Sequence, residues 1–258
     1  MKPNDLRQTL KRGELVTGTM VREMRTPAVM QIMAGAGFDF VLLDLEHSVF
    51  GMETTADLIR QARAVGLCTI VRVPEIQKHW ISRILDAGAD GLMIPYVETV
   101  EEARRIIDFA KYPPMGRRGL GTQIGHTDYL AGESDSLIET KNRETIIVCQ
   151  IETPLGVKNI DEITSVAGVD YVIIGPNDLA LTMGLAGQIT SDAVFAQIQR
   201  VIDVCKSKNM PAGIHVGNQK LIERCMQAGM RLIAYSTDVG LLAAAGKQAS
   251  EQLRNLKK

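Results

Sequence analysis

The sequence lacks the features that direct a chain to a membrane or to nucleic acid. Its 258 residues carry a formal net charge of −1 and include only 4% aromatic residues, and they contain no basic cluster with interleaved aromatics. This balance gives no electrostatic reason to expect nucleic acid or an anionic membrane as a partner. No apolar run reaches about 18 residues, and the opening MKPNDLRQTLKRGE holds no apolar segment of signal-peptide length. We therefore expect a cytoplasmic protein.

Cysteine is also scarce, and its spacing argues against two kinds of site. Cys68, Cys149, Cys205 and Cys225 lie far apart, without the close pairs that zinc sites and redox motifs use. Most of them stand in apolar surroundings, so we expect small core residues.

What the sequence does contain is a repeated pattern of short apolar runs, each followed by a helical periodicity. A continuous apolar run is typical of a strand buried on both faces of a parallel sheet. Gly37, Gly66, Gly88 and Gly229 follow helical patterns, in the position of a helix C-cap. The predicted strands span 15–20, 38–44, 67–73, 91–95, 145–152, 171–175, 211–216 and 231–235. The predicted helices span 27–36, 53–65, 77–86, 100–110, 157–166, 192–208, 219–228 and 239–255.

The number of strand–helix units indicates the fold. Eight units in about 250 residues match a (β/α)₈ barrel, so we predict one α/β TIM-barrel domain over residues 1–258. An open doubly wound sheet is the alternative, but no GxGxxG lies between the first predicted strand and helix. Segment 111–143, with Pro113 and Pro114 adjacent and weak periodicity, is predicted to be a long loop that is functional or covers a partner surface.

Polar residues end or follow several of the apolar runs. In a barrel, the carboxyl ends of all strands meet at one mouth, which is where active sites lie. One mouth could therefore hold all of these side chains. They are His47, Arg72, Gln150, Glu152, Asn177 and Asp178.

This set of residue types suggests metal-assisted chemistry on a 2-oxo acid. Glu152 and Asp178 could share Mg²⁺ or Mn²⁺, because a hard ion takes one or two protein carboxylates and completes its shell with water and substrate. The substrate could chelate the ion through its carboxylate and keto oxygens. Arg72 would then face the keto oxygen, where charge grows as an enolate forms. His47 could transfer a proton, as histidine does near neutral pH.

Each residue also has a structural interpretation. Asp178 could cap a short helix beginning at Leu179, Arg72 could neutralise Glu152, and His47 alone could be structural. The combination is harder to explain in this way, because buried unpaired charges are costly.

Two other chemistries find little support. No predicted strand contains the lysine that a Schiff-base aldolase needs. The segments HVGNQ and STDVG, after the last two predicted strands, lack the glycine pairs that hold phosphate.

Longer motifs surround these residues: AGAGFDFVLLDLEH, VRVP, GLMIPYVETVEEA, YPPMGRRGLG, VCQIET and GVDYVIIGPNDLA. Together they resemble the HpcH/HpaI aldolases, metal-dependent class II pyruvate aldolases that include 4-hydroxy-2-oxoheptanedioate aldolase and 2-dehydro-3-deoxyglucarate aldolase. The resemblance runs almost end to end. It implies reversible aldol cleavage of a 4-hydroxy-2-oxo acid to pyruvate and an aldehyde, without an organic cofactor.

The resemblance also implies roles for the main site residues. His47 matches the catalytic base, and Arg72 matches the residue that stabilises the enolate. Glu152 and Asp178 match the metal ligands, with Mg²⁺, Mn²⁺ or Co²⁺ as the ion.

Three further positions match the family. Gln150 and the backbone around Asn177 and Asp178 match pyruvate-binding positions. Asp86 matches an acidic residue that raises the basicity of the histidine. Because Asp86 falls near the end of a predicted helix, opposite the mouth, a kink or a neighbouring subunit would have to bring it close.

Departures from the family pattern leave other activities open. TQIGHTDY follows GRRGLG where many relatives place arginine-containing segments, and His126 within it is interpreted as a surface-loop histidine. DLEHSVF and PPMGRRGLG also resemble macrophomate synthase, which decarboxylates oxaloacetate to the same enolate. Oxaloacetate decarboxylation is therefore one alternative. A CoA-ester lyase of the citrate-lyase type and a catalytically silent barrel are two more, the former disfavoured by an isoelectric point near 6.4.

The family resemblance implies a homo-oligomer, commonly a hexamer built from dimers. The last predicted helix, 239–255, has an alanine-rich apolar face that could pack on a neighbouring subunit. Packing on its own barrel is the alternative.

Overall fold

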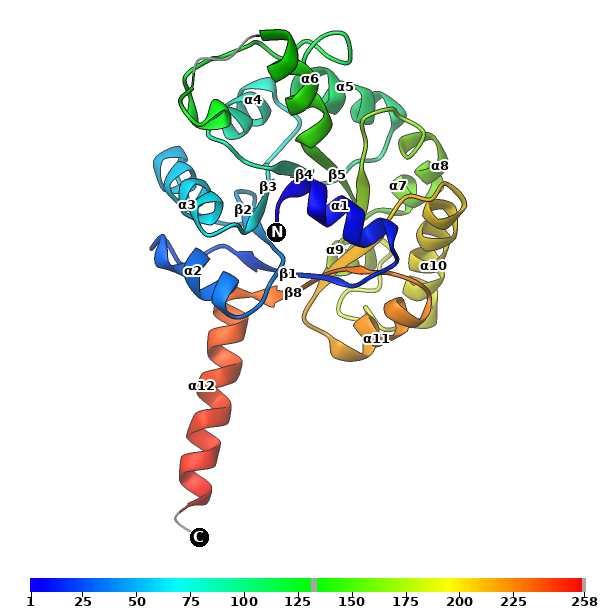
Figure 1. The fold of residues 1–258 in the computed structure, drawn as a ribbon. Coiled ribbons are helices and arrows are strands. Elements are labelled where there is room, and N and C mark those ends of the chain that lie inside the picture. The colour runs from blue at the N-terminus through cyan, green and yellow to red at the C-terminus, as the bar shows by residue number, and fades with distance from the viewer. Residues whose placement is uncertain (131–133, 257–258) are drawn as a thin grey trace.

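The computed structural model, which describes residues 1–130 and 134–256, is a closed barrel of parallel strands (Figure 1). Each strand pairs with the next, and β8 returns to β1. Every residue of β2 to β6 is buried, as predicted for strands covered on both faces. The predicted TIM barrel is confirmed. The strands are β1 (Val16–Val21), β2 (Phe40–Asp44), β3 (Cys68–Arg72), β4 (Gly91–Ile94), β5 (Ile146–Ile151), β6 (Tyr171–Ile174), β7 (Ala212–Val216) and β8 (Leu232–Thr237).

Helices surround the barrel, and glycines end several of them as predicted. Gly37, Gly66, Gly88 and Gly229 all have positive φ, the left-handed conformation that glycine adopts without a steric penalty. The helices are α1 (Pro3–Lys11), α2 (Ala28–Gly35), α3 (Met52–Ala64), α4 (Lys78–Asp86), α5 (Val100–Ala110), α6 (Ser134–Glu144), α7 (Pro154–Lys158), α8 (Ile160–Ile163), α9 (Pro176–Thr182), α10 (Asp192–Ser207), α11 (Gln219–Gln227) and α12 (Asp238–Asn255).

Two hydrophobic clusters divide the interior. The larger one lies between strands and helices, and the smaller one fills the barrel itself. Leu6 and Leu10 of α1 belong to the smaller cluster, so this helix closes the amino-terminal end of the barrel. Helix α1 was not predicted from the sequence, because its other residues are mostly polar. All four cysteines are buried, as predicted.

The helical pattern predicted over 157–166 is wrong in its bounds. Two short helices, α7 and α8, replace it. Thr153 caps α7 by accepting a hydrogen bond from the Gly156 amide, which starts that helix earlier. Asn159 then separates the two helices with a backbone conformation outside the helical range.

Segment 111–143 is more ordered than the predicted loop. It contains the 3₁₀ turn η1 (Gly125–Thr127) and most of α6. His126 is only 3% exposed, so its interpretation as a surface-loop histidine is wrong. Its ring lies 6.0 Å from that of Tyr112, and both side chains are buried within the segment's own contacts with the fold.

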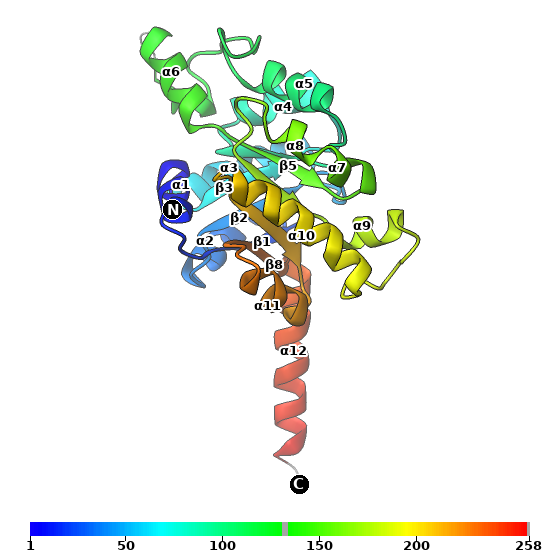
Figure 2. The same cartoon turned by 90° about the vertical axis from the view of Figure 1, so that its right-hand side faces the viewer.

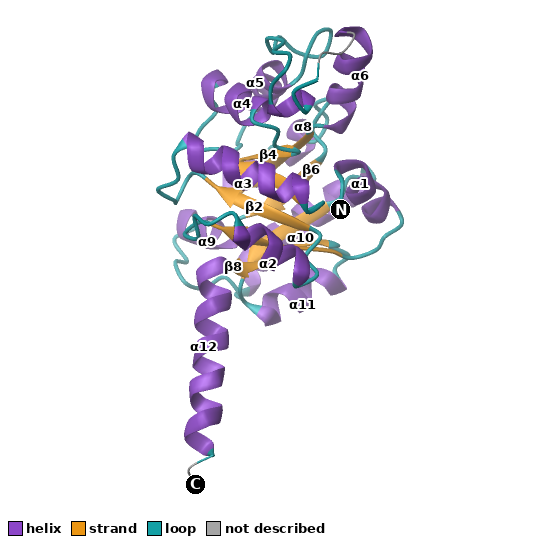
Figure 3. Cartoon of the chain, turned by 60° about the vertical axis from the view of Figure 1, so that its left-hand side comes forward, coloured by secondary structure: helices purple, strands orange, loops and turns teal. Residues whose placement is uncertain are grey.

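The carboxyl-terminal helix stands apart from the rest of the fold. Figures 1 to 3 show α12 projecting away from the barrel from three directions. Asp238, its first residue, is the only buried one in the helix. In the single chain, therefore, this helix does not pack along its length on its own barrel. No helix in the described ranges is both long and apolar enough to cross a bilayer.

Candidate active site at the carboxyl ends of the strands

A buried ion pair joins the ends of β2 and β3. Arg72 donates from Nε to Asp44 Oδ1 and from Nη2 to Asp44 Oδ2, both at 2.8 Å. The register places the two residues opposite each other on neighbouring strands. Burial opposes ionisation of Asp44, but the Arg72 guanidinium outweighs it and lowers the pKa of the carboxyl. The pair fixes a cation at the mouth in one orientation.

Glu46 extends this pair toward the predicted base. Its Oε2 lies 3.0 Å from Arg72 Nη1 and 3.8 Å from His47 Nε2. Burial raises the pKa of Glu46, Arg72 and His47 oppose that shift, and the charges of Asp44 and Asp178 add to it. The His47 side chain is 56% exposed, so it opens to solvent at the rim. Asp44 Oδ1 accepts from the His47 amide at 3.4 Å, which ties the loop to the ion pair.

Glu152 is a buried carboxylate just beyond β5. It is 1% exposed, and its two oxygens accept hydrogen bonds from the Tyr96 amide at 2.9 Å and from the Gln150 side chain. Burial raises the pKa of Glu152 to about 7, although both hydrogen bonds oppose that shift. The charges of Asp178 and Glu46 raise it further. Arg72 forms its ion pairs with Asp44 and Glu46, so the interpretation of Arg72 as the neutralising partner of Glu152 is wrong.

Asp178 approaches Glu152 from the first turn of α9. Gly175 is the residue before that helix, so Asp178 lies inside it and does not cap a helix starting at Leu179, as one interpretation held. A Cβ at Gly175 would collide with the Glu152 carboxylate and the Gln150 amide, so glycine leaves the space that these groups occupy. Asn177 is exposed beside Asp178. Gln150, Glu152 and Asp178 thus lie on one side of the mouth, and Asn177 follows the same strand end with an exposed side chain.

Tyr96 touches both carboxylates and was not expected from the sequence. It follows β4 with φ +50°, a conformation that is uncommon for a residue other than glycine. This conformation directs its amide to Glu152. Burial and the charge of Asp178, with which its hydroxyl hydrogen-bonds, raise the pKa of Tyr96 to about 12. The only sequence signal is a tyrosine directly after the predicted strand 91–95.

These residues fit a divalent cation. In the described part of the chain no group of three or more His, Cys, Asp and Glu side chains has the arrangement of a complete protein cage. The mouth does offer the carboxylates of Glu152 and Asp178. It also offers the side-chain oxygen of Gln150, Oε1, which is buried and has no hydrogen-bond partner among the described residues. An all-oxygen set with few protein ligands is what a hard ion uses when water and substrate complete its shell.

Asp86 does not join this group within one chain. It ends α4, at the amino-terminal side of the barrel, and accepts from Arg118 Nη2 at 2.7 Å. The Arg118 side chain is 1% exposed and its guanidinium lies 4.7 Å from the centre of the Tyr112 ring. This agrees with the expectation that Asp86 lies opposite the mouth.

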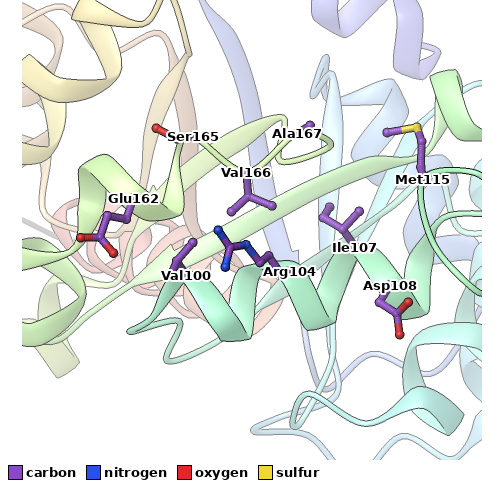
Figure 4. A pocket seen from close by; sticks show the side chains of 9 residues that line it. All are labelled: Val100, Arg104, Ile107, Asp108, Met115, Glu162, Ser165, Val166 and Ala167. Carbon is purple, nitrogen blue, oxygen red and sulfur yellow. The ribbon is translucent and has the colours of Figure 1, made fainter.

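Two cavities lie away from the mouth. One, of about 510 Å³, lies on the outer wall between α5 and residues 162–167, as Figure 4 shows around Arg104 and Glu162. The other, of about 900 Å³, lies at the amino-terminal end of the strands beside α1 and His126. None of the mouth residues described above lines either cavity.

Comparison with known proteins decides the family. The family model HpcH/HpaI aldolase/citrate lyase matches residues 21–245. The chain belongs to this family. Its predicted resemblance is confirmed, and the match covers every residue of the mouth.

Individual relatives and structures agree. The chain is 36% identical to a 4-hydroxy-2-oxovalerate aldolase of Novosphingobium aromaticivorans, over 91% of this chain and 88% of that protein. It is 32% identical to a hydroxypyruvate/pyruvate aldolase of Roseobacter denitrificans, over 95% of this chain and 94% of that protein. The crystal structure of an HpcH/HpaI aldolase from Desulfitobacterium hafniense superposes with a TM-score of 0.91 at 30% identity, covering 96% of each chain. Macrophomate synthase superposes with a TM-score of 0.82 at 28% identity, covering 98% of this chain and 90% of that one.

Proposed function

We propose that this HpcH/HpaI family member is a carbon–carbon lyase that cleaves a 4-hydroxy-2-oxo acid reversibly to pyruvate and an aldehyde. The observation that carries the proposal is the buried carboxylate Glu152, on which the charge of Asp178 acts, at the same mouth as an arginine held by Asp44. Such a site can bind a cation and a 2-oxo acid together. The aldolase names of the relatives described above support the same reaction type.

Glu152 and Asp178 would hold Mg²⁺, Mn²⁺ or Co²⁺, and the amide of Gln150 with the backbone near Asn177 would hold the 2-oxo acid. When bound, the ion supplies positive charge to the carboxylate and keto oxygens of the substrate. Arg72, at the end of β3, would face the keto oxygen of the substrate. Because Asp44 and Glu46 fix its guanidinium, Arg72 stabilises developing enolate charge without reorganising.

His47 is the proposed proton acceptor. It takes the proton of the C4 hydroxyl, directly or through water, as the C3–C4 bond breaks and the aldehyde leaves. Its exposure suits this role, since the leaving aldehyde occupies the rim. Asp86 would support His47 only if a neighbouring subunit presents it, because α4 ends on the far side of the barrel.

A homo-oligomer forms part of the proposal. Four residues of α12 and its C-cap residue lie at helical spacing on one face, and all are exposed: Leu242, Ala245, Ala249, Leu253 and Leu256. A lone helix that buries almost nothing is marginal in water. A second copy of the chain, covering this face, would stabilise it.

Oxaloacetate decarboxylation is the second candidate, favoured by the structural match to macrophomate synthase. It forms the same enolate but needs no acceptor for a hydroxyl proton. A CoA-ester lyase and a silent barrel remain as further alternatives from the sequence.

Pyruvate release from 4-hydroxy-2-oxo acids of different chain length, compared with oxaloacetate decarboxylation, tests the proposal. We expect release from at least one 4-hydroxy-2-oxo acid, and loss of that activity but not of decarboxylation in His47→Ala. Decarboxylation without any aldol cleavage would move the assignment to the second candidate. Inactivity on every compound would favour the lyase or the silent barrel.

A further inference from the structure

One ionisable side chain at the mouth has no part in the scheme above: His215, the next-to-last residue of β7. Its neighbours Ile214 and Val216 pack in the cluster between strands and helices. Successive side chains of a strand point to opposite faces, so His215 points into the barrel. It therefore enters the lumen at the end where the substrate site lies.

The surroundings of His215 hold it in one tautomer. Its Nε2 lies 2.9 Å from the carbonyl oxygen of Ser236, and a carbonyl can only accept, so Nε2 carries the hydrogen. The lone pair of the neutral ring is then on Nδ1, which makes no hydrogen bond within residues 1–130 and 134–256. Burial lowers the pKa of His215, the Ser236 carbonyl opposes that shift, and the charge of Arg72 adds to it. The ring is thus neutral near pH 7.

One flank of His215 carries only a small side chain. Ala234, its register partner on β8, has a methyl group, so no large side chain of β8 stands directly beside the imidazole. His215 faces the lumen near the carboxyl end of β7, and the ion pair of Asp44 and Arg72 lies at the carboxyl ends of β2 and β3, so the three side chains share one end of the barrel. The charges of Arg72 and Asp44 also act on its imidazole. Most of the barrel interior is filled by apolar side chains, so a histidine here is an exception.

We propose that His215 is a second catalytic histidine, which exchanges the proton at C3 of pyruvate. The proposal rests on the proposed function, because it places the three-carbon part of the substrate between Arg72 and His215. His47 then serves the C4 oxygen at the rim, and His215 serves C3 in the lumen.

The step balances in both directions. In synthesis, Nδ1 takes a proton from the methyl group of pyruvate, the C–H electron pair forms the C2–C3 double bond, and the keto oxygen takes the displaced pair. The enolate carbon then attacks the aldehyde, and the new alkoxide takes a proton from His47. In cleavage, His47 takes the hydroxyl proton, and protonated His215 delivers one to C3 of the enolate. Exchange with water returns each histidine to its starting state.

The test compares His215→Gln with wild type by ¹H NMR, which follows the loss of the C3 proton signal of pyruvate in D₂O. Mg²⁺ is the added ion, because Mn²⁺ is paramagnetic and would broaden the signals. Glutamine retains a side-chain N–H for the Ser236 carbonyl but has no basic nitrogen. His79→Gln, on the outer helix α4 and exposed, is the matched control. Mg²⁺ affinity by calorimetry and thermal unfolding are measured on the same samples.

We expect His215→Gln to slow C3 exchange at least about 100-fold, the usual contribution of a positioned acid–base group. Metal affinity should stay within about threefold of wild type, and the melting temperature within a few degrees. Exchange at the wild-type rate in the variant would overturn the proposal, as would a parallel loss of all three properties, which is the signature of a structural histidine. Wild type that exchanges C3 but cleaves no 4-hydroxy-2-oxo acid would contradict the proposed function and leave this role standing.

Discussion

Asp44 and Arg72 form a two-point ion pair across the ends of neighbouring strands, with both contacts at 2.8 Å. Asp44 is completely buried and the Arg72 side chain is 6% exposed. Such a pair aligns the planar guanidinium more strictly than a single contact would. We regard this alignment as what allows Arg72 to meet developing charge at one defined point.

Asp44→Asn should therefore damage both stability and activity. Removing one partner of a buried pair costs roughly 3 kcal/mol, and a misaimed catalytic group can cost about 100-fold in kcat. Urea unfolding and steady-state kinetics measure the two effects. Asp57→Asn is the control, because Asp57 pairs with Arg60 at the surface and should cost well under about 1 kcal/mol. Equal behaviour of the two variants would contradict the role of the buried pair.

The carboxylates of Glu152 and Asp178 should determine the affinity for the metal ion, which can be measured without substrate. Glu152→Gln and Asp178→Asn each remove a charged ligand and should weaken Mn²⁺ binding by about 10- to 100-fold or more. Tyr96→Phe should weaken it less, because the backbone amide on Glu152 remains and only the hydroxyl contact with Asp178 is lost. Electron paramagnetic resonance of free Mn²⁺ gives the dissociation constants. Wild-type affinity in both carboxylate variants would rule out the ligand assignment.

His126 should make the fold sensitive to acid. Burial, with help from the charge of Arg118, lowers the pKa of His126 from 6.5 to about 3. Below pH 6.5 the unfolded chain therefore binds a proton that the folded chain refuses, and the free energy of unfolding falls as pH falls through this window. Between pH 7 and 5 this loss is on the order of 2 kcal/mol.

Urea unfolding at both pH values measures this loss, and comparison with His126→Gln isolates the contribution of one group. Glu152 shifts stability in the opposite sense, since its raised pKa favours the folded state as pH falls below about 7. Glu152 is present in both wild type and His126→Gln, so its effect cancels when their unfolding free energies are subtracted. An identical pH dependence in the variant and wild type would show that His126 does not carry the effect.

The exposed face of α12 should control assembly. Leu242→Asp places a charge on the apolar stripe and should shift the chain to a smaller species in size-exclusion chromatography with light scattering. Gln248→Asp introduces the same charge off the stripe and should leave the mass unchanged. If Leu242→Asp and wild type have the same mass, α12 does not form the interface.

The fold was predictable because its strands are buried on both faces and therefore form continuous apolar runs, such as FVLLD of β2. The polar residues that end these runs, including Arg72 and Glu152, were visible for the same reason. Their partners were not, because ion pairs such as Asp44 with Arg72 depend on strand register. Helix α1 was missed because only a narrow face of a polar segment is buried.

Two histidines show why the remaining site was hidden. His126 stands in a polar, glycine-rich segment, yet its burial depends on contacts with Tyr112 and the helix α4 far away in the sequence. His215 lies between apolar residues of β7. Whether it points into the lumen or toward the helices depends on which alternate residues of the strand face the lumen. Neither property can be read from local composition.

The most direct test of the account is metal-dependent pyruvate release from a 4-hydroxy-2-oxo acid, followed through coupled reduction of pyruvate. We predict release by the wild type with Mg²⁺ or Mn²⁺, abolition by a chelator, recovery when the ion is restored, and no recovery for a folded Glu152→Gln variant. Release that persists in the chelator, or equally in Glu152→Gln, would contradict the proposal that Glu152 holds a catalytic cation at the mouth of this barrel.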